Sequence, residues 1–85
     1  MPFLLPKKVT QENALQVQKE GLLNSPSLRL VDCSELKDFD STVLTVLLAW
    51  QQKMITEGQS ISVEHAPKKL KVLAGVYGVS SLLGL

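Results

Sequence analysis

The segment Leu28–Cys33 most constrains the fold, because its apolar residues would face both sides of an extended chain. A strand that is apolar on both faces belongs in the centre of a parallel sheet, where helices cover both surfaces. The preceding stretch, Asn24–Ser27, has the composition of a turn. We therefore expect an α/β fold in which right-handed helical crossovers connect parallel strands.

Extended and helical patterns alternate along the rest of the chain. Phe3–Leu5 could form a short strand that ends at Pro6, and Ser60–His65 alternates polar and apolar residues like a half-buried strand. The apolar spacing predicts three helices, which run from Thr10 as a possible N-cap to Leu23, from about Thr42 to Glu57, and from Pro67 to Gly78. The tail, residues 79–85, could add either a helical turn or a strand.

Length and charge narrow the functional classes. Eighty-five residues are enough for one domain, and we expect residues 1–85 to form a single one. The formal net charge is only +1 and the aromatic residues are few, so nucleic-acid binding is disfavoured. The longest apolar run, Val43–Trp50, is too short to cross a bilayer, and the N-terminus lacks the pattern of a secretory signal. We expect a cytoplasmic protein without direct membrane insertion.

The chain offers little for catalysis, metal binding or cofactor binding. Its single histidine, His65, and its single cysteine, Cys33, have no partners at ligand spacing. One cysteine cannot form an internal disulfide, and Cys33 is expected to be a buried structural thiol in a reducing compartment. The glycines match neither a P-loop nor a dinucleotide-binding fingerprint. We predict that the chain is not an enzyme and holds no metal or cofactor.

The predicted start of the second helix carries the most informative polar residues. Asp40 or Ser41 could cap this helix, and its first free N–H groups favour negative charge, so a partner or a phosphate could reach Ser41. The apolar residues Val43–Trp50 cover an unusually broad face. Two explanations stay open at this point, burial within the domain or coverage by a partner.

A basic cluster occupies the start of the last predicted helix. It consists of Lys68, Lys69 and Lys71, and the helix dipole slightly disfavours cations there. A solvated face is the simpler interpretation, and a site for phosphate or lipid headgroups is the alternative.

These features together resemble the STAS domain family. In that family a strand ends in Asp-x-Ser, and a short loop leads to Asp-Ser/Thr-Ser/Gly-Gly-aliphatic at a helix start. Asp32 and Ser34 match the first pattern, and Asp40 and Ser41 match the second. The resemblance extends over residues 28–80, with Val43 in place of the usual glycine. A β-branched residue there should hinder close approach of a partner to the backbone.

The resemblance implies a fold and a function. It implies a STAS-like sandwich, with a mostly parallel central sheet of about four strands and three to four helices. The likeness is greatest to the MlaB-type subunit of the phospholipid-transporting ABC complex, which implies docking on that complex's ATPase, at the inner membrane through this partner. The alternative it implies is an anti-sigma factor antagonist whose Ser41 is phosphorylated by an anti-sigma factor kinase. The partner-binding residues would be Phe39, Asp40, Ser41, Thr42 and Thr45.

Overall fold

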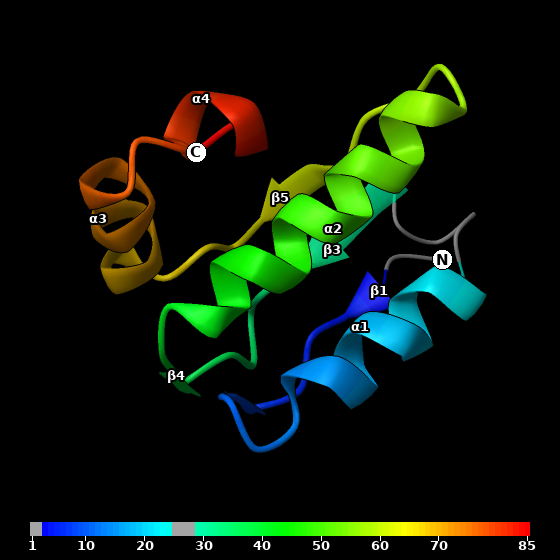
Figure 1. Ribbon diagram of the computed structural model, residues 1–85. Helices are drawn as coiled ribbons and strands as arrows, with labels where there is room; N and C mark the ends of the chain where they lie inside the picture. Colours follow the sequence, from blue (N-terminus) through cyan, green and yellow to red (C-terminus); the bar gives the residue numbers. More distant parts are fainter. Residues whose placement is uncertain (1–2, 25–28) are drawn as a thin grey trace.

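The centre of the fold is a small parallel sheet. The computed structural model describes residues 3–24 and 29–85 (Figure 1). Strands β1 (Phe3–Leu4), β3 (Leu30–Asp32) and β5 (Ser62–Glu64) form a parallel sheet in the order β1-β3-β5. Val31 of β3 lies opposite Phe3 on one side and Val63 on the other, and its side chain is fully buried. The prediction of a central strand in a parallel sheet is therefore confirmed.

A second parallel pair of strands was not predicted. Strand β2 (Lys8–Val9) pairs with β4 (Asp38–Phe39), so the described strands form two small sheets, whereas we expected one sheet of about four strands. Each of these strands has two residues, which is too short for an alternating pattern to be recognised. The α/β fold class with parallel strands is confirmed. Apart from Asn24, the predicted turn Asn24–Ser27 lies outside the described part of the chain, and so does Leu28, the first residue predicted for the central strand.

Four helices complete the fold over the described residues. They are α1 (Ala14–Leu23), α2 (Thr42–Thr56), α3 (Lys68–Val76) and α4 (Ser80–Leu83). None of them is both long and apolar enough to span a lipid bilayer. Gly58 and Gly78 adopt positive φ angles just after α2 and α3, as expected of glycines that end helices. The tail forms the helical alternative, α4.

The first helix begins later than predicted. Its regular part starts at Ala14, after a turn in which the Ala14 N–H donates to the Thr10 carbonyl over 2.8 Å. The Thr10 N–H donates in turn to Oδ1 of Asn13 over 2.9 Å. Thr10 therefore caps this preceding turn, and Asn13 is the residue directly before the regular helix.

Helix α2 lies at the centre of the hydrophobic core. Its buried residues are Val43, Leu44, Val46, Leu47, Trp50 and Met54. The indole of Trp50 contacts the Phe3 ring edge-on, with 5.0 Å between ring centroids, and its Nε1–H donates to the Gln18 carbonyl over 3.0 Å. The broad apolar face of this helix is thus buried within the fold, so of our two explanations the internal one is correct.

Helix α1 runs beside α2 and comes close to it at one glycine (Figure 1). Gly21 of α1 lies directly against the Trp50 indole, and a Cβ atom at this position would overlap the ring. The φ angle of Gly21 is not positive, so backbone conformation does not require glycine here. Glycine is needed for the close packing against the indole.

Candidate functional site

The start of α2 is held in place by the second strand pair. The Asp40 N–H donates to the Val9 carbonyl over 3.3 Å, immediately after β4 ends at Phe39. Oδ1 of Asp40 then accepts the Thr42 N–H over 2.9 Å and also accepts the Thr42 hydroxyl. These hydrogen bonds, the one from the Thr42 hydroxyl first, lower the pKa of Asp40 below its ordinary value. Asp40 is thus the residue that caps the helix with its side chain.

Ser41 occupies the adjacent position without serving as a cap. It directly precedes α2 in the helical conformation, with φ −63° and ψ −15°, and its side chain makes no capping hydrogen bond. The residue is exposed. Since Asp40 satisfies the helix start, the Ser41 hydroxyl is accessible to a partner or to a modifying enzyme.

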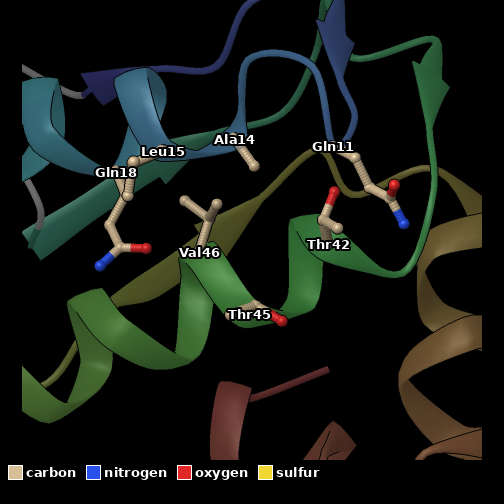
Figure 2. A pocket seen from close by; sticks show the side chains of 7 residues that line it. All are labelled: Gln11, Ala14, Leu15, Gln18, Thr42, Thr45 and Val46. Carbon is tan, nitrogen blue, oxygen red and sulfur yellow. The ribbon is translucent and has the colours of Figure 1, made fainter.

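Two grooves flank the first turns of α2. The first, about 270 Å³, lies between α1 and α2 (Figure 2), and its lining residues are Gln11, Ala14, Leu15, Gln18, Thr42, Thr45 and Val46. Figure 2 shows the side chains of Thr42 and Val46 pointing from α2 toward α1. The second groove, about 200 Å³, lies between α2 and the end of α3, and its lining residues are Ser41, Leu44, Thr45, Leu48, Tyr77 and Val79. Thr45 lines both grooves.

The structure thus brings four of the five predicted docking residues to one exposed region and places the fifth beneath it. Phe39 is only 6% exposed, and Nζ of Lys69 lies 5.5 Å from the centroid of its ring. A buried ring can support the helix start, but it offers little surface to a partner. We expected Phe39 to contact a partner, and the structure instead places it beneath the surface, where it supports the helix start.

The structure also corrects one argument drawn from Val43. We expected its β-branched side chain to hinder a partner's approach to the backbone, but this side chain is fully buried in the core. It faces away from solvent and so obstructs nothing on the outer side of the helix start. The departure from the family pattern at Val43 serves packing.

The other half of the motif forms a separate polar cluster at the end of β3. Oδ1 of Asp32 accepts the Ser34 N–H over 2.8 Å and lies 3.2 Å from Nδ1 of His65. The backbone hydrogen bond from Ser34 is the largest cause of the lowered pKa of Asp32. Burial raises the pKa of the neighbouring Cys33 thiol to about 12, so the thiolate nucleophile is disfavoured at neutral pH.

Sequence reasoning missed several residues of the site. Helical spacing predicts Gln11 on the solvated side of the first helix and Gln18 near its apolar face, yet both line the first groove. The same spacing predicts Tyr77 on the buried face of the last helix, yet it is 59% exposed and lines the second groove. It lies just past the end of α3, where helical spacing no longer predicts direction. Only the relative placement of α1, α2 and α3 brings these residues together.

The family follows from a comparison of the whole chain with models of known families. A model described as "Mlab, STAS domain" matches residues 8–84. The chain belongs to the MlaB-type STAS domain family. No curated protein matches the chain. The match spans strands β2 to β5, the helices α1 to α4 and every residue of the site, and only β1 precedes it among the described elements.

Membership of the MlaB-type STAS family bears on the chemistry of the site. Domains of this family are generally non-catalytic, and at the family level they are partner-binding subunits of an ABC transporter. The described residues contain no cluster of three or more His, Cys, Asp or Glu side chains that could hold a metal ion. Family membership thus favours the interpretation of the exposed helix start as a surface for binding.

Proposed function

We propose that this chain is a non-enzymatic cytoplasmic subunit that docks on the ATPase of a phospholipid-transport ABC complex and supports it. The docking surface is the Asp40-Ser41-Thr42 helix start together with Thr45, and the ATPase would bring the chain to the inner membrane. Residues 1–85 would act as a single STAS domain. Family membership supports the choice of partner, and the geometry of the helix start supports the choice of surface.

One observation carries this proposal. Asp40 caps α2 with its own side chain, and the neighbouring Ser41 hydroxyl is left exposed. Because the Ser41 hydroxyl makes no capping hydrogen bond, it can bond to a partner without weakening the helix start. Because the supporting residues beneath it are buried, the surface is pre-organised, and pre-organisation lowers the entropic cost of binding.

The two grooves give this surface its shape. Their walls combine apolar side chains with uncharged hydroxyl and amide groups: Thr42 lines the first groove, Ser41 the second, and Thr45 both. Apolar side chains of a partner could enter the grooves while its polar backbone groups bond to the hydroxyl groups between them. Anchoring pockets of this kind contribute much of the binding energy in protein interfaces.

Replacement of Thr45 tests the surface directly. The variant Thr45→Arg places a long charged side chain where both grooves meet, so co-purification with the ATPase should be lost. Thr56→Arg is the matched control, because Thr56 is an exposed threonine at the other end of the same helix. Both variants should keep the circular dichroism spectrum of the wild type. Equal ATPase binding by Thr45→Arg and wild type would refute the docking surface.

A second candidate function rests on the accessibility of Ser41. An anti-sigma factor antagonist would have this residue phosphorylated by an anti-sigma factor kinase, and the buried Val43 leaves the approach open. A phosphate adds a charge of about −1.5 to −2 beside Asp38 and Asp40, which would repel an acidic partner. Incubation with candidate kinases and ATP, followed by intact-mass measurement of wild type and Ser41→Ala, tests this function. It requires a phosphate that the alanine variant does not acquire.

A further inference from the structure

The charges of this chain are divided unevenly along its length. Residues 65–85 contain three lysines and no aspartate or glutamate, whereas residues 1–64 contain six Lys/Arg and eight Asp/Glu. The C-terminal quarter therefore carries a formal charge of +3 and the rest −2, although the whole chain is nearly neutral. This imbalance gives α3 a local positive field that the net charge conceals.

Two of the three lysines, Lys68 and Lys71, do not stabilise the fold in any evident way, whereas Nζ of Lys69 lies over the Phe39 ring. Lys68, Lys69 and Lys71 occupy the first turn of α3, where the positive end of the helix dipole repels cations. Within the described residues, no carboxylate forms an ion pair with any of the three. Charges such as those of Lys68 and Lys71, which break a local rule without a compensating ion pair inside the molecule, are typical of a functional surface.

Exposed apolar residues accompany these lysines. Val72 and Val76 lie one helical turn apart on α3 and are 57% and 76% exposed, while the buried residues Leu70 and Ala74 face the core. Lys68 precedes Val72 by one further turn, so lysine and valines share the outward face of the helix. This outward face of α3, comprising Lys68, Lys71, Val72 and Val76, is called the α3 face below.

The α3 face adjoins the docking surface on α2. Tyr77, directly after α3, lines the same groove as Ser41 and Thr45. At the other end of α3, Nζ of Lys69 lies over the ring of Phe39, which precedes the Asp40-Ser41-Thr42 helix start. Residues from both ends of α3 are thus connected to the helix start that we propose contacts the ATPase, Tyr77 through the second groove and Lys69 through the Phe39 ring.

We infer that the docking surface continues onto the α3 face and that its occupant there is an acidic segment of the same ATPase. Carboxylates of that segment would meet the lysines, and its apolar side chains would cover Val72 and Val76. This inference rests on the proposed function. Opposite charges across an interface steer association and fix its orientation, and this use fits Lys68 and Lys71, which form no ion pair with a described residue.

Two other occupants fit these observations less well. Lipid-binding patches that rely on charge usually carry about four to eight clustered basic residues, and the α3 face has fewer. Single-stranded nucleic acid requires aromatic stacking platforms, and none of the four residues of the α3 face is aromatic. Tyr77, just past the helix, lines the groove toward α2. A protein segment also accounts for the exposed valines, because interfaces combine an apolar centre with a charged rim.

Charge reversal tests the inference. The variant K68E/K71E places acidic residues where the helix dipole favours them, so lost binding would not result from unfolding of α3. Its dissociation constant for the ATPase should rise at least about tenfold, and wild-type binding should weaken as salt is added. K7E/K19E is the matched control, because it makes the same change in net charge at exposed lysines that form no ion pair with a described residue. It should bind within about twofold of wild type.

Chemical cross-linking provides a second measurement. A zero-length carbodiimide joins lysine amines only to carboxylates that lie next to them. Applied to the complex, it should link Lys68, Lys69 or Lys71 to an aspartate or glutamate of the ATPase.

The outcomes separate this inference from the proposed function. Suppose that Thr45→Arg abolishes ATPase binding, that K68E/K71E binds like wild type, and that the wild-type complex forms no such cross-link. The inference is then overturned and the proposed function stands. If the wild type does not bind the ATPase at all, the proposed function itself fails. If instead K68E/K71E loses only binding to vesicles of phosphatidylcholine and phosphatidylglycerol, the occupant is a lipid surface and the acidic segment is refuted.

Discussion

The starts of α2 and α3 differ in how their residues meet the free N–H groups and the positive dipole end that every helix start presents. At α2, the Asp40 carboxylate accepts the Thr42 N–H and places negative charge where the helix dipole favours it. At α3, Pro67 precedes the helix without a side-chain cap, and three lysines occupy the first turn. The first start is stabilised by its own residues, which frees Ser41. The second is not, and this difference suggests that its charges serve an interaction outside the fold.

The packing of the helices differs in the same sense. Helix α2 has buried residues from Val43 to Met54 and packs against α1, where Gly21 lies directly against the Trp50 indole. Helix α3 buries only Leu70 and Ala74, and the space around Gly75 is open. The α2 surface is therefore supported by close packing beneath it, whereas α3 is less closely packed and its side chains can change conformation more easily.

The largest expected effect comes from exchanging glycine for alanine on the two sides of this comparison. Gly21→Ala should lower the free energy of unfolding by about 1–3 kcal/mol, because its Cβ overlaps the buried indole and the packing must shift. Gly75→Ala should raise it by about 0.5–1 kcal/mol, because alanine favours the helix and meets no neighbour. Urea denaturation of both variants measures the difference. A stabilising Gly21→Ala would show that the α1–α2 contact is not close.

A smaller loss is expected when the cap of α2 is removed. Asp40→Ala leaves the Thr42 N–H without its acceptor, so the midpoint of thermal unfolding should fall. Asp38→Ala is the control, because Asp38 is exposed and its side chain accepts no hydrogen bond from a described residue. The distinction between the two helix starts would be lost if both alanine variants melted at the same temperature.

The same carboxylate predicts a pH dependence. Hydrogen bonds lower the pKa of Asp40 in the folded state, so the unfolded chain binds the proton more tightly in acid. This contribution to stability is present above the ordinary aspartate pKa and is lost as the pH falls through the lower, folded value. Asp40→Asn should flatten the decline of stability below about pH 4. Asp32, whose pKa is also lowered, should retain part of the decline, and Asp32→Asn/Asp40→Asn should remove more of it.

The sequence predicted those features that depend on local pattern. The central strand, the extent of α2 and the glycine stops after α2 and α3 follow from periodicity and from the preferences of single residues. The strands β2 and β4 could not be predicted, because a two-residue strand has no period and is defined only by its partner. The start of α1 was predicted too early, because the turn at Thr10 is capped like a helix.

The candidate site was predictable in part for a similar reason. The motif located Asp40 and Ser41, but only coordinates could show that the carboxylate of one caps the helix while the hydroxyl of the other remains exposed. The grooves depend on the packing of distant segments, which places Tyr77 in the same groove as Ser41 and Gln18 in the same groove as Thr45. Burial of Phe39 and Val43 likewise depends on tertiary packing.

The smallest expected effect concerns Lys68, at the start of α3. Lys68→Glu places a carboxylate at the first residue of α3, and it should raise the free energy of unfolding by about 0.3–1 kcal/mol at low salt. Thermal denaturation at two salt concentrations checks this, because screening should reduce the gain. If the variant is more stable and yet binds the ATPase less well, the lysine is retained for binding at a cost in stability. A variant no more stable than wild type would mean that α3 tolerates its lysines, and the contrast with α2 would lose its energetic basis.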